Sequence, residues 1–238
     1  MSINSFAYLI FHVVILISLF LGKLIYPKMK FVSKSEYIRS LPVILFFIVW
    51  DYLVTGKWWD FNPEFILPIH NIFRLRLPIE EILFFFIIPF ALLTFVKNLS
   101  NIERFKNNDK DVYNDDIFNI EVFKQLSILI KGLLLLSAVY FLDLEKWYTF
   151  SVLILLFITD LSFLQRKVYF YGLLFTVLTT FIFNCYLTFL PVVRYTQVYK
   201  IGLRVGSIPI EDFGYGILLY LWIVKAAYVS KTTKNSKT

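Results

Sequence analysis

The fold is decided by a stretch at residues 77–96, which reads LPIEEILFFFIIPFALLTFV. Two adjacent acids stand directly before an apolar run, and this run approaches the ~20 residues that a membrane-spanning helix requires. Proline is favoured at the start of a helix, and carboxylates there complement the positive end of the helix dipole. The stretch therefore predicts a transmembrane helix that begins near the membrane surface with two carboxyl groups.

Long apolar runs separated by short charged loops continue along the whole chain. Hydrophobic residues make up 58% of its 238 residues and aromatic residues 20%, and the mean hydropathy is +0.69. A soluble domain does not need so many apolar side chains, because its surface must be mostly polar. We expect an all-α, polytopic membrane protein with about seven transmembrane helices. The predicted spans are residues 5–26, 37–54, 79–95, 122–142, 147–164, 168–189 and 210–228.

Membrane topology explains the net charge of +7 better than nucleic-acid binding does. If the N-terminus is outside, fifteen Lys and Arg residues fall in inner loops and seven in outer loops. This asymmetry is the positive-inside bias of membrane proteins. We predict a multi-pass protein of the plasma membrane, with its N-terminus outside and its C-terminus in the cytoplasm, and no nucleic-acid partner.

The sequence offers no metal or cofactor site. Cys185 is the single cysteine and lies in a predicted span, and the chain has only two histidines, His12 and His70. A metal site built from thiolates or imidazoles is therefore not expected. No glycine-rich loop of the GxGxxG or GxxxxGK kind occurs, which argues against a tightly bound dinucleotide. We expect neither metal nor cofactor.

A second copy of the acidic motif indicates an internal repeat. Residues 208–215 read IPIEDFGY and open the last predicted span, and each copy follows an outer loop with proline and arginine. Spans one to three then correspond to spans five to seven, with the fourth as a connector. Because four spans separate equivalent helices, the two halves have the same orientation, as in parallel repeats. Both motifs are therefore expected at one membrane face, where they can close on one cavity between the halves.

We divide the chain into four segments on this basis. Residues 1–97 form the first three-helix repeat, residues 98–146 an inner loop with the connector helix, residues 147–229 the second repeat and residues 230–238 a polar tail. The loop from Lys97 to Glu121 is rich in Asn, Asp and Lys, a composition that does not bury itself. The chemistry is accordingly expected in the two repeats.

The paired acids allow two readings. As caps at the membrane surface they need no other role. Their recurrence at equivalent places, directly before apolar sequence, favours a functional role, because an ionisable group costs ~2.5–3.5 kcal/mol at mid-span and is typically retained for function. Adjacent helical residues do not share a face, so each pair should divide between the cavity and a loop arginine. The expected groupings are Glu80 and Glu81 with Arg74 or Arg76, and Glu211 and Asp212 with Arg204.

Aromatic residues follow both motifs. Phe84 and Phe85 come within a turn of the first, Tyr215 follows the second, and Trp58 lies in an outer loop. Aromatic faces stabilise positive charge, and plain packing is the alternative in a chain with 27 Phe residues. A cation-stabilising cavity and an ordinary aromatic core both fit this pattern.

Three polar residues lie within or close to predicted spans. Asp51 either lines the same cavity or makes a hydrogen bond at its helix end. Asp160 is expected to pair with Arg166, and Asn184 to form a hydrogen bond between helices.

Several segments resemble the bacterial and archaeal lycopene cyclase family. TGKWWDFNP at 55–63 and LPIEEILFF at 77–85 resemble its first half, and PVVRY at 191–195, GLR at 202–204 and IPIEDF at 208–213 resemble its second. In that family the halves occur as two small subunits or fused in one chain, as here. The chain departs from the family pattern at Ile66-Leu67-Pro68 and at Thr196-Gln197. These departures concern loop geometry and end-group specificity and leave the acidic motifs intact.

The resemblance implies a lycopene β-cyclase, an isomerase of carotenoid biosynthesis that needs no cofactor. An acid protonates the terminal double bond of lycopene, the cation closes a six-membered β-ionone ring, and a base removes a proton to give γ- or β-carotene. Lycopene and the lipid bilayer are the implied partners, together with other carotenoid enzymes. We predict Glu80 and Glu211 as the acid and base, with Glu81 and Asp212 as supporting carboxylates. The predicted substrate-binding residues or charge partners are Arg74, Arg204, Asp51, Trp58, Phe84, Phe85, Tyr195 and Tyr215.

Two other classes of protein fit seven helices. A retinal-binding photoreceptor needs a lysine in its last span, and Lys225 lies there. However, a lysine near a helix end can extend to the interface, and the third span has no mid-helix acid as counter-ion. A small-molecule transporter fits the repeat, but the acids cluster at helix starts rather than at depth. Cyclisation remains the prediction.

Overall fold

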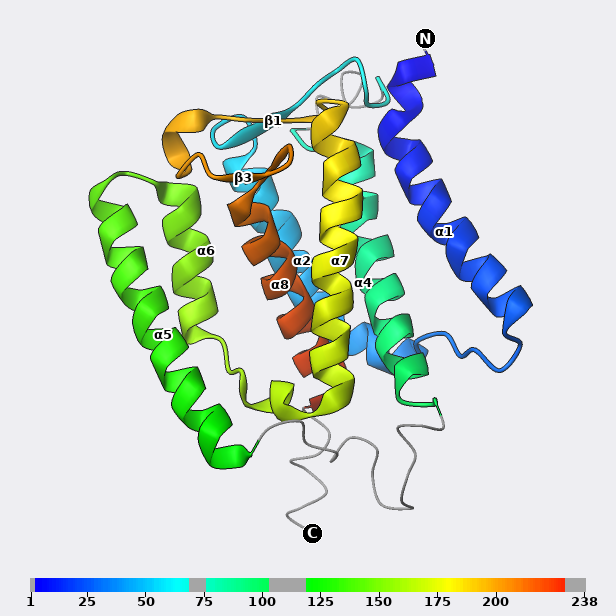
Figure 1. Cartoon of the computed structure of the whole chain (residues 1–238). Coiled ribbons are helices and arrows are strands. Elements are labelled where there is room, and N and C mark those ends of the chain that lie inside the picture. Colours follow the sequence, from blue (N-terminus) through cyan, green and yellow to red (C-terminus); the bar gives the residue numbers. More distant parts are fainter. Residues whose placement is uncertain (1–2, 69–75, 103–118, 230–238) are drawn as a thin grey trace.

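A computed structural model describes residues 3–68, 76–102 and 119–229, and this part of the chain is an α-helical bundle (Figure 1). Six helices are long and apolar enough to cross a membrane, which confirms the predicted all-α membrane fold. In chain order the helices are α1 (Ala7–Ile25), α2 (Lys34–Val54), α4 (Ile79–Leu99), α5 (Ile120–Asp143), α6 (Trp147–Ile158), α7 (Lys167–Phe189) and α8 (Ile210–Val224), which continues as a π-helical turn at Lys225–Val229.

The fifth predicted span, 147–164, is wrong in length. Helix α6 ends at Ile158, so its 12 residues cover ~18 Å of a hydrocarbon core that is ~30 Å thick. The backbone of Thr159 is extended, with a ψ of 133°, and Thr159 and Asp160 both make hydrogen bonds beyond α6. Thr159 accepts a hydrogen bond from the Trp222 indole at 2.8 Å, and Asp160 accepts one from the backbone N–H of Ser162 at 2.9 Å.

Asp160 pairs with Lys225 at 3.1 Å and not with Arg166, which corrects the sequence-based expectation. Partial burial raises the pKa of Asp160, but hydrogen bonds from Ser162 and Lys225 outweigh it and leave this pKa below its usual value. Because both side chains of the pair are nearly half exposed, it contributes little to stability.

Two other helix boundaries differ slightly from the prediction. Helix α2 begins at Lys34, because Ser33 and Glu36 form a capping box there. Helix α4 continues through Lys97, whose ammonium lies 2.7 Å from the Glu36 carboxylate. The polar loop predicted from Lys97 therefore begins later, and most of it, residues 103–118, lies outside the described residues.

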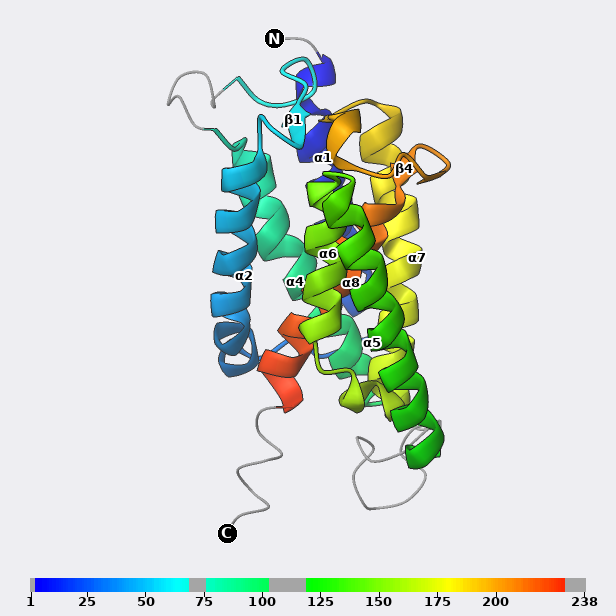
Figure 2. The same ribbon diagram turned by 90° about the vertical axis from the view of Figure 1, so that its left-hand side faces the viewer.

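Helices α4 and α8, which carry the acidic motifs, lie in the middle of the bundle. They are the most buried of the six spanning helices, and their N-terminal ends lie at the same end of the molecule (Figure 1). Helices α1 and α2 pack against α4, and α6 and α7 pack against α8. Helix α5 lies outside this arrangement, along α6 (Figure 2). The acids are thus brought to one end of the bundle.

Short strands cover the end of the bundle that carries the acids. Strand β1 (Trp59–Phe61) follows α2, and β2 (Val193–Tyr195) follows α7. The two strands pair antiparallel, with Asp60 opposite Arg194. A second hairpin, β3 (Arg204–Val205) and β4 (Ile208–Pro209), leads into α8, and Gly206 in its two-residue loop has a φ of 64°, which glycine adopts without strain.

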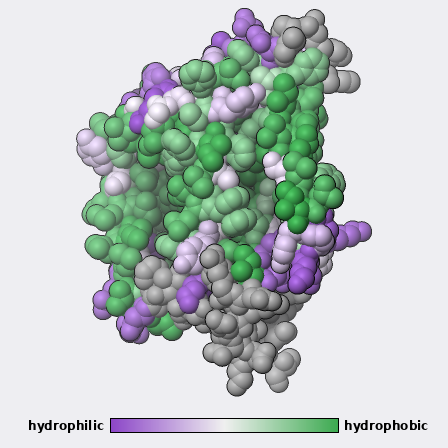
Figure 3. Space-filling view, turned by 45° about the vertical axis from the view of Figure 1, so that its right-hand side comes forward, coloured by the Kyte–Doolittle hydropathy of each residue, from purple (hydrophilic) through white to green (hydrophobic). Residues whose placement is uncertain are grey.

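The lateral surface of the bundle is apolar. Figure 3 shows hydrophobic residues over the middle of the molecule and hydrophilic residues toward its two ends. Large side chains on this surface are extensively exposed, among them Leu24 at 76%, Ile25 at 82% and Leu136 at 71%. Such a wide apolar surface is stable in lipid and not in water, which agrees with a membrane protein.

Candidate active site

The four acids of the two motifs are all buried. Glu80 is 0% exposed, Glu81 8%, Glu211 3% and Asp212 4%. A buried carboxyl group is costly unless hydrogen-bond donors or a shared proton compensate it. The partners of each acid therefore indicate what it does.

Glu81 and Asp212 line the same chamber, a cavity of about 70 Å³ below strands β1 and β2. This arrangement confirms the expectation that the two motifs converge on one cavity. The chamber walls come from α1, α2, α4, α6, α7, α8 and both strands. Besides the two acids, the lining includes Tyr8, Asp51, Trp59, Phe84, Tyr148, Asn184, Tyr195 and Tyr215.

Glu81 belongs to a hydrogen-bond network built from the first part of the chain. The hydroxyl of Tyr8, on α1, donates to Oε2 of Glu81. The carboxyl of Asp51, near the end of α2, is in hydrogen-bonding contact with Glu81. Asp51 also accepts a hydrogen bond from Nε1 of Trp59 at 2.9 Å, so β1 fixes its orientation. The sequence leaves Asp51 either in the cavity wall or in a hydrogen bond at its helix end, and the structure shows it in the cavity wall.

Asp212 accepts three hydrogen bonds from the second part of the chain. The hydroxyl of Tyr148 donates to Oδ1 at 3.0 Å, and Oδ2 accepts from the Tyr195 hydroxyl at 2.5 Å and from Nδ2 of Asn184 at 3.2 Å. The Asn184 contact joins α7 to α8, as the sequence predicts. Burial and the nearby Asp212 carboxylate raise the pKa of Tyr195 well above its usual value, so Tyr195 stays protonated as a donor.

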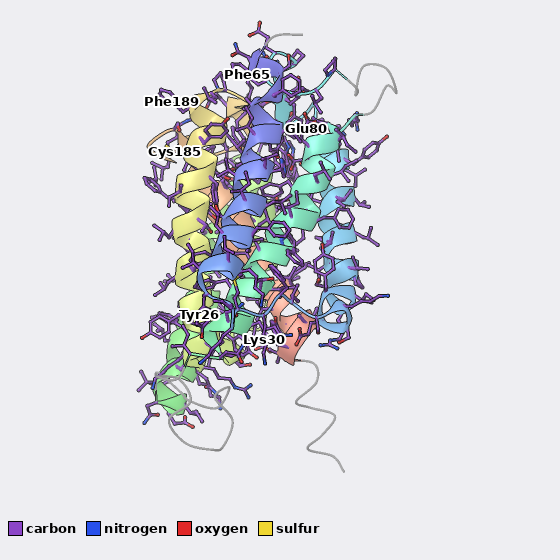
Figure 4. All side chains as sticks on the ribbon, turned by 90° about the vertical axis from the view of Figure 1, so that its right-hand side faces the viewer. Tyr26, Lys30, Phe65, Glu80, Cys185 and Phe189 are labelled. Carbon is purple, nitrogen blue, oxygen red and sulfur yellow. The ribbon has the colours of Figure 1, made fainter. Side chains whose placement is uncertain are left out.

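Glu80 and Glu211 do not line the chamber; they hold the preceding loops. Oε1 of Glu80, labelled at the start of α4 in Figure 4, accepts from the backbone N–H of Leu67 at 2.6 Å. Oε1 of Glu211 accepts from the backbone N–H of Ile201 at 2.9 Å and from the Thr149 hydroxyl at 2.6 Å. Each motif thus directs its second acid to the cavity and its first acid to a loop.

The loop partners of these acids differ from the arginines that the sequence suggests. Arg204 is exposed and donates to the carbonyl of Ser207, and Arg76 is exposed and donates to the carbonyl of Tyr52 at 3.3 Å. Arg74 lies outside the described residues. A guanidinium is costly to desolvate, whereas a loop N–H is an inexpensive donor for a buried carboxyl. The division of each pair is as expected; among the described residues, Glu80 accepts from a backbone N–H, and Glu211 accepts from a backbone N–H and from the Thr149 hydroxyl.

The predicted aromatic residues separate into two groups. Phe84 and Tyr215 line the chamber. Phe85 is fully buried against Phe47, with ring centroids 6.3 Å apart, and belongs to the core. Trp58 packs on Tyr148, with centroids 5.9 Å apart, and it is the neighbouring Trp59 that reaches the chamber.

Sequence analysis does not assign Tyr8 and Tyr148, although both donate to the chamber acids. They lie 73 and 64 residues from Glu81 and Asp212 in the chain, so no local motif connects them. Tyr8 is the second residue of α1, and Tyr148 is the second residue of α6. A comparison of these two helix starts in the sequence is the signal that could have identified them.

Positive charge beside the chamber comes from the loop before α8. Lys200 is buried, and its Nζ lies 5.6 Å from the centroid of the Tyr195 ring. Burial and the charge of Arg204 lower the pKa of Lys200, while Glu211 and Asp212 oppose this shift. Within the described ranges, no group of three or more His, Cys, Asp or Glu is placed to hold a metal ion.

Comparison with known families agrees with the position of the site. The family model described as lycopene cyclase matches residues 4–99 and 145–227. These two segments contain every acid and tyrosine of the chamber and omit α5. The chain has no significant match among curated proteins or among solved structures. Because the family match covers most of its residues, the chain belongs to the lycopene cyclase family.

Proposed function

We propose that this protein is a lycopene β-cyclase, which closes β-ionone rings at the linear ends of lycopene by acid-initiated cyclisation. Membership of the lycopene cyclase family implies a carotenoid substrate and a cyclase of carotenoid biosynthesis in the membrane. The observation that carries the finer proposal is the chamber lined by both Glu81 and Asp212. An acid and a base on the same small cavity are what this isomerisation requires.

Glu81 is the proposed acid. Its carboxyl contacts that of Asp51 in a buried site. Two buried carboxyl groups in contact do not carry two negative charges; they share a proton instead. The Glu81–Asp51 pair therefore holds a proton beside the cavity, and Glu81 delivers it to the terminal double bond.

Asp212 is the proposed base. Hydrogen bonds from Tyr148, Tyr195 and Asn184 favour its carboxylate form over the carboxylic acid. After protonation, the neighbouring double bond attacks the cationic carbon, and a carbon–carbon bond closes the ring. Asp212 removes a proton from the ring carbon beside the new cation, which restores a double bond. Return of this proton to Glu81 resets the site with no net redox change.

The surroundings of the two acids suit a cationic intermediate. Phe84, Trp59 and Tyr215 line the chamber with aromatic rings, which stabilise positive charge. The chamber is small, and strands β1 and β2 form part of its wall, which limits the room for water beside the cation. Water at this point would trap the cation as an alcohol instead of a ring.

We also propose that the chain consists of two related halves, residues 1–97 and 147–229, joined by the connector segment 98–146. The support is positional. In each half the first helix supplies a tyrosine donor, the second a polar partner and the third the chamber acid, and β1 pairs antiparallel with β2. The corresponding residues are Tyr8 and Tyr148, Asp51 and Asn184, and Glu81 and Asp212.

The proposed orientation puts the N-terminus outside the cell and the C-terminus in the cytoplasm. The excess of Lys and Arg in the loops at the far end from the acids supports it. In this orientation the chamber lies toward the outer face of the plasma membrane.

The function is tested by pigment analysis in a lycopene-accumulating bacterial host. Cells that express this chain should convert lycopene to γ- or β-carotene, identified by chromatography and absorption spectra, and cells with an empty vector should retain lycopene. Unchanged lycopene at a verified level of protein in the membrane would refute the proposal. A ring of the ε type would retain the cyclase assignment but refute the β-ring assignment.

Replacement of Lys225 by Met should leave cyclisation within about twofold of the wild type, because exposed ion pairs contribute little. Its Nζ is paired with Asp160, and both side chains are nearly half exposed. The measurement is the rate of product formation in isolated membranes. A retinal-binding protein would instead depend on this lysine, so total loss of activity in Lys225→Met would contradict the present reading.

A further inference from the structure

An elongated apolar groove leads away from the acid chamber. It has a volume of about 510 Å³ and lies between α1 and α4 on one side and α7 and α8 on the other. Phe84, Asn184, Asp212 and Tyr215 line both the chamber and the groove. The two spaces are therefore neighbours with a shared wall, so the groove is the nearest apolar space for the rest of a molecule whose end lies in the chamber.

The groove runs across most of the membrane. Along α4 its lining extends from Phe84 to Leu99, and along α1 from Phe11 to Tyr26. At 1.5 Å per helical residue, each of these stretches covers ~22 Å. Figure 4 shows Tyr26 and Lys30 at the opposite end of the bundle from Glu80. Such a long, apolar space fits a linear hydrocarbon chain better than a compact ligand.

The groove also opens toward the lipid. Tyr26 lines its far end and is 47% exposed on the outside of the bundle, and Ser18 on the same helix is exposed as well. In Figure 1, α1 inclines away from α7 toward this end. A substrate dissolved in the bilayer can therefore enter from the side, without passing through water.

We infer that this groove binds the polyene chain of the carotenoid, so that one end lies in the acid chamber and each binding event cyclises that end alone. The inference rests on the proposed function, because it assigns a place to the unreacted part of the same substrate. It adds a binding site and an order of reaction that the acids alone do not give.

The other side of the chamber supports cyclisation of one end at a time. There, the space between α2 and α8 is filled by aromatic side chains. The centroid of the Trp222 ring lies 5.2 Å from that of Phe46 and 5.8 Å from that of Phe47. The ring centroids of Trp50 and Tyr215 are 5.7 Å apart. Among the described residues, these packed rings occupy the space in which a second groove for the other end of the substrate would have to lie. A product with one ring must leave, reverse and bind again before the other end can react.

A chemical block of the groove after folding tests this inference. Thr179 lines the groove five residues from Asn184, ~7.5 Å along α7, and its hydroxyl bonds only to carbonyls of its own helix, those of Phe175 and Thr176. The preceding residue, Leu178, is 55% exposed on the outside of the bundle and provides the matched control. In a Cys185→Ser background, Thr179→Cys and Leu178→Cys are treated with N-phenylmaleimide in native membranes and then supplied with lycopene.

Before labelling, the rate of each cysteine variant is measured, and this rate is the reference for the same variant after treatment. After labelling, we expect at least a tenfold loss of rate in Thr179→Cys and no loss in Leu178→Cys. Lycopene added first should slow labelling at position 179, and the monocyclic product should appear in the membrane before the bicyclic one. Because the block is applied to folded protein, impaired folding cannot produce this difference.

Two results would overturn the inference: full activity after complete labelling at position 179, or bicyclic product without a released monocyclic intermediate. The first would mean that the groove holds lipid and not substrate. If the Cys185→Ser background itself converts no lycopene while the wild type does, the background is replaced by Cys185→Ala. If the wild type converts none, the proposed function fails rather than the groove.

Discussion

Replacement of Glu81 by Gln should lower the rate of lycopene cyclisation at least ~100-fold, the typical loss when a general acid is removed. Gln has nearly the same size and still accepts the hydrogen bond from Tyr8. It cannot donate an acidic proton to a double bond, and it removes the proton shared with Asp51. The measurement is product formed per unit of protein in isolated membranes, with the amount of each variant determined by immunoblot.

The matched control for this experiment is Glu80→Gln. It lies on the same turn of α4, and a Gln carbonyl oxygen can still accept the hydrogen bond from the backbone N–H of Leu67. We expect this variant to retain activity within a fewfold of the wild type. Loss in Glu80→Gln with normal rates in Glu81→Gln would reverse the two roles and restore Glu80 as the acid.

The comparison of these two residues shows how far the sequence can locate the site. The motif at 77–84 predicts a helix start, two acids at this start and their division between two directions. It does not show which acid faces the cavity, because that depends on where Tyr8 and Leu67 lie in the folded chain. These contacts come from α1 and from the loop before α4, and periodicity within α4 carries no information about either.

The fold could be predicted more fully than the site, because the length of each apolar run in the sequence determines most of the fold. Six of the seven predicted spans appear as spanning helices. The exception, α6, stops at Ile158 although apolar residues continue to Leu164. A hydropathy average is little affected by two polar residues such as Thr159 and Asp160. In the structure, however, the backbone leaves the helical conformation at Thr159. Thr159 then accepts a hydrogen bond from Trp222, and Asp160 accepts one from Ser162.

Replacement of Asp212 by Asn should also lower cyclisation at least ~100-fold, since it removes the proposed base. The carboxylate accepts hydrogen bonds from Tyr148, Tyr195 and Asn184. An amide in its place presents an NH₂ group to at least one of these donors, so the site loses an acceptor as well as a negative charge. The rate in membranes is again the measurement, and thermal stability in detergent shows whether the bundle remains folded.

Two controls separate the base role from the structural role of Asp212. Glu211→Gln keeps an acceptor for the Ile201 N–H and should retain most of the activity. Tyr195→Phe removes one of three donors to Asp212, so we expect a smaller loss, of about tenfold or less, in line with the ~0.5–1.5 kcal/mol of a typical hydrogen bond. If Asp212→Asn were stable and fully active while Glu81→Gln was inactive, a single acid would suffice, and proton removal would have to fall to a group outside this pair. Loss in both, with activity kept in Glu80→Gln and Glu211→Gln, would assign the chemistry to the second acid of each motif, where the two helices face the same chamber.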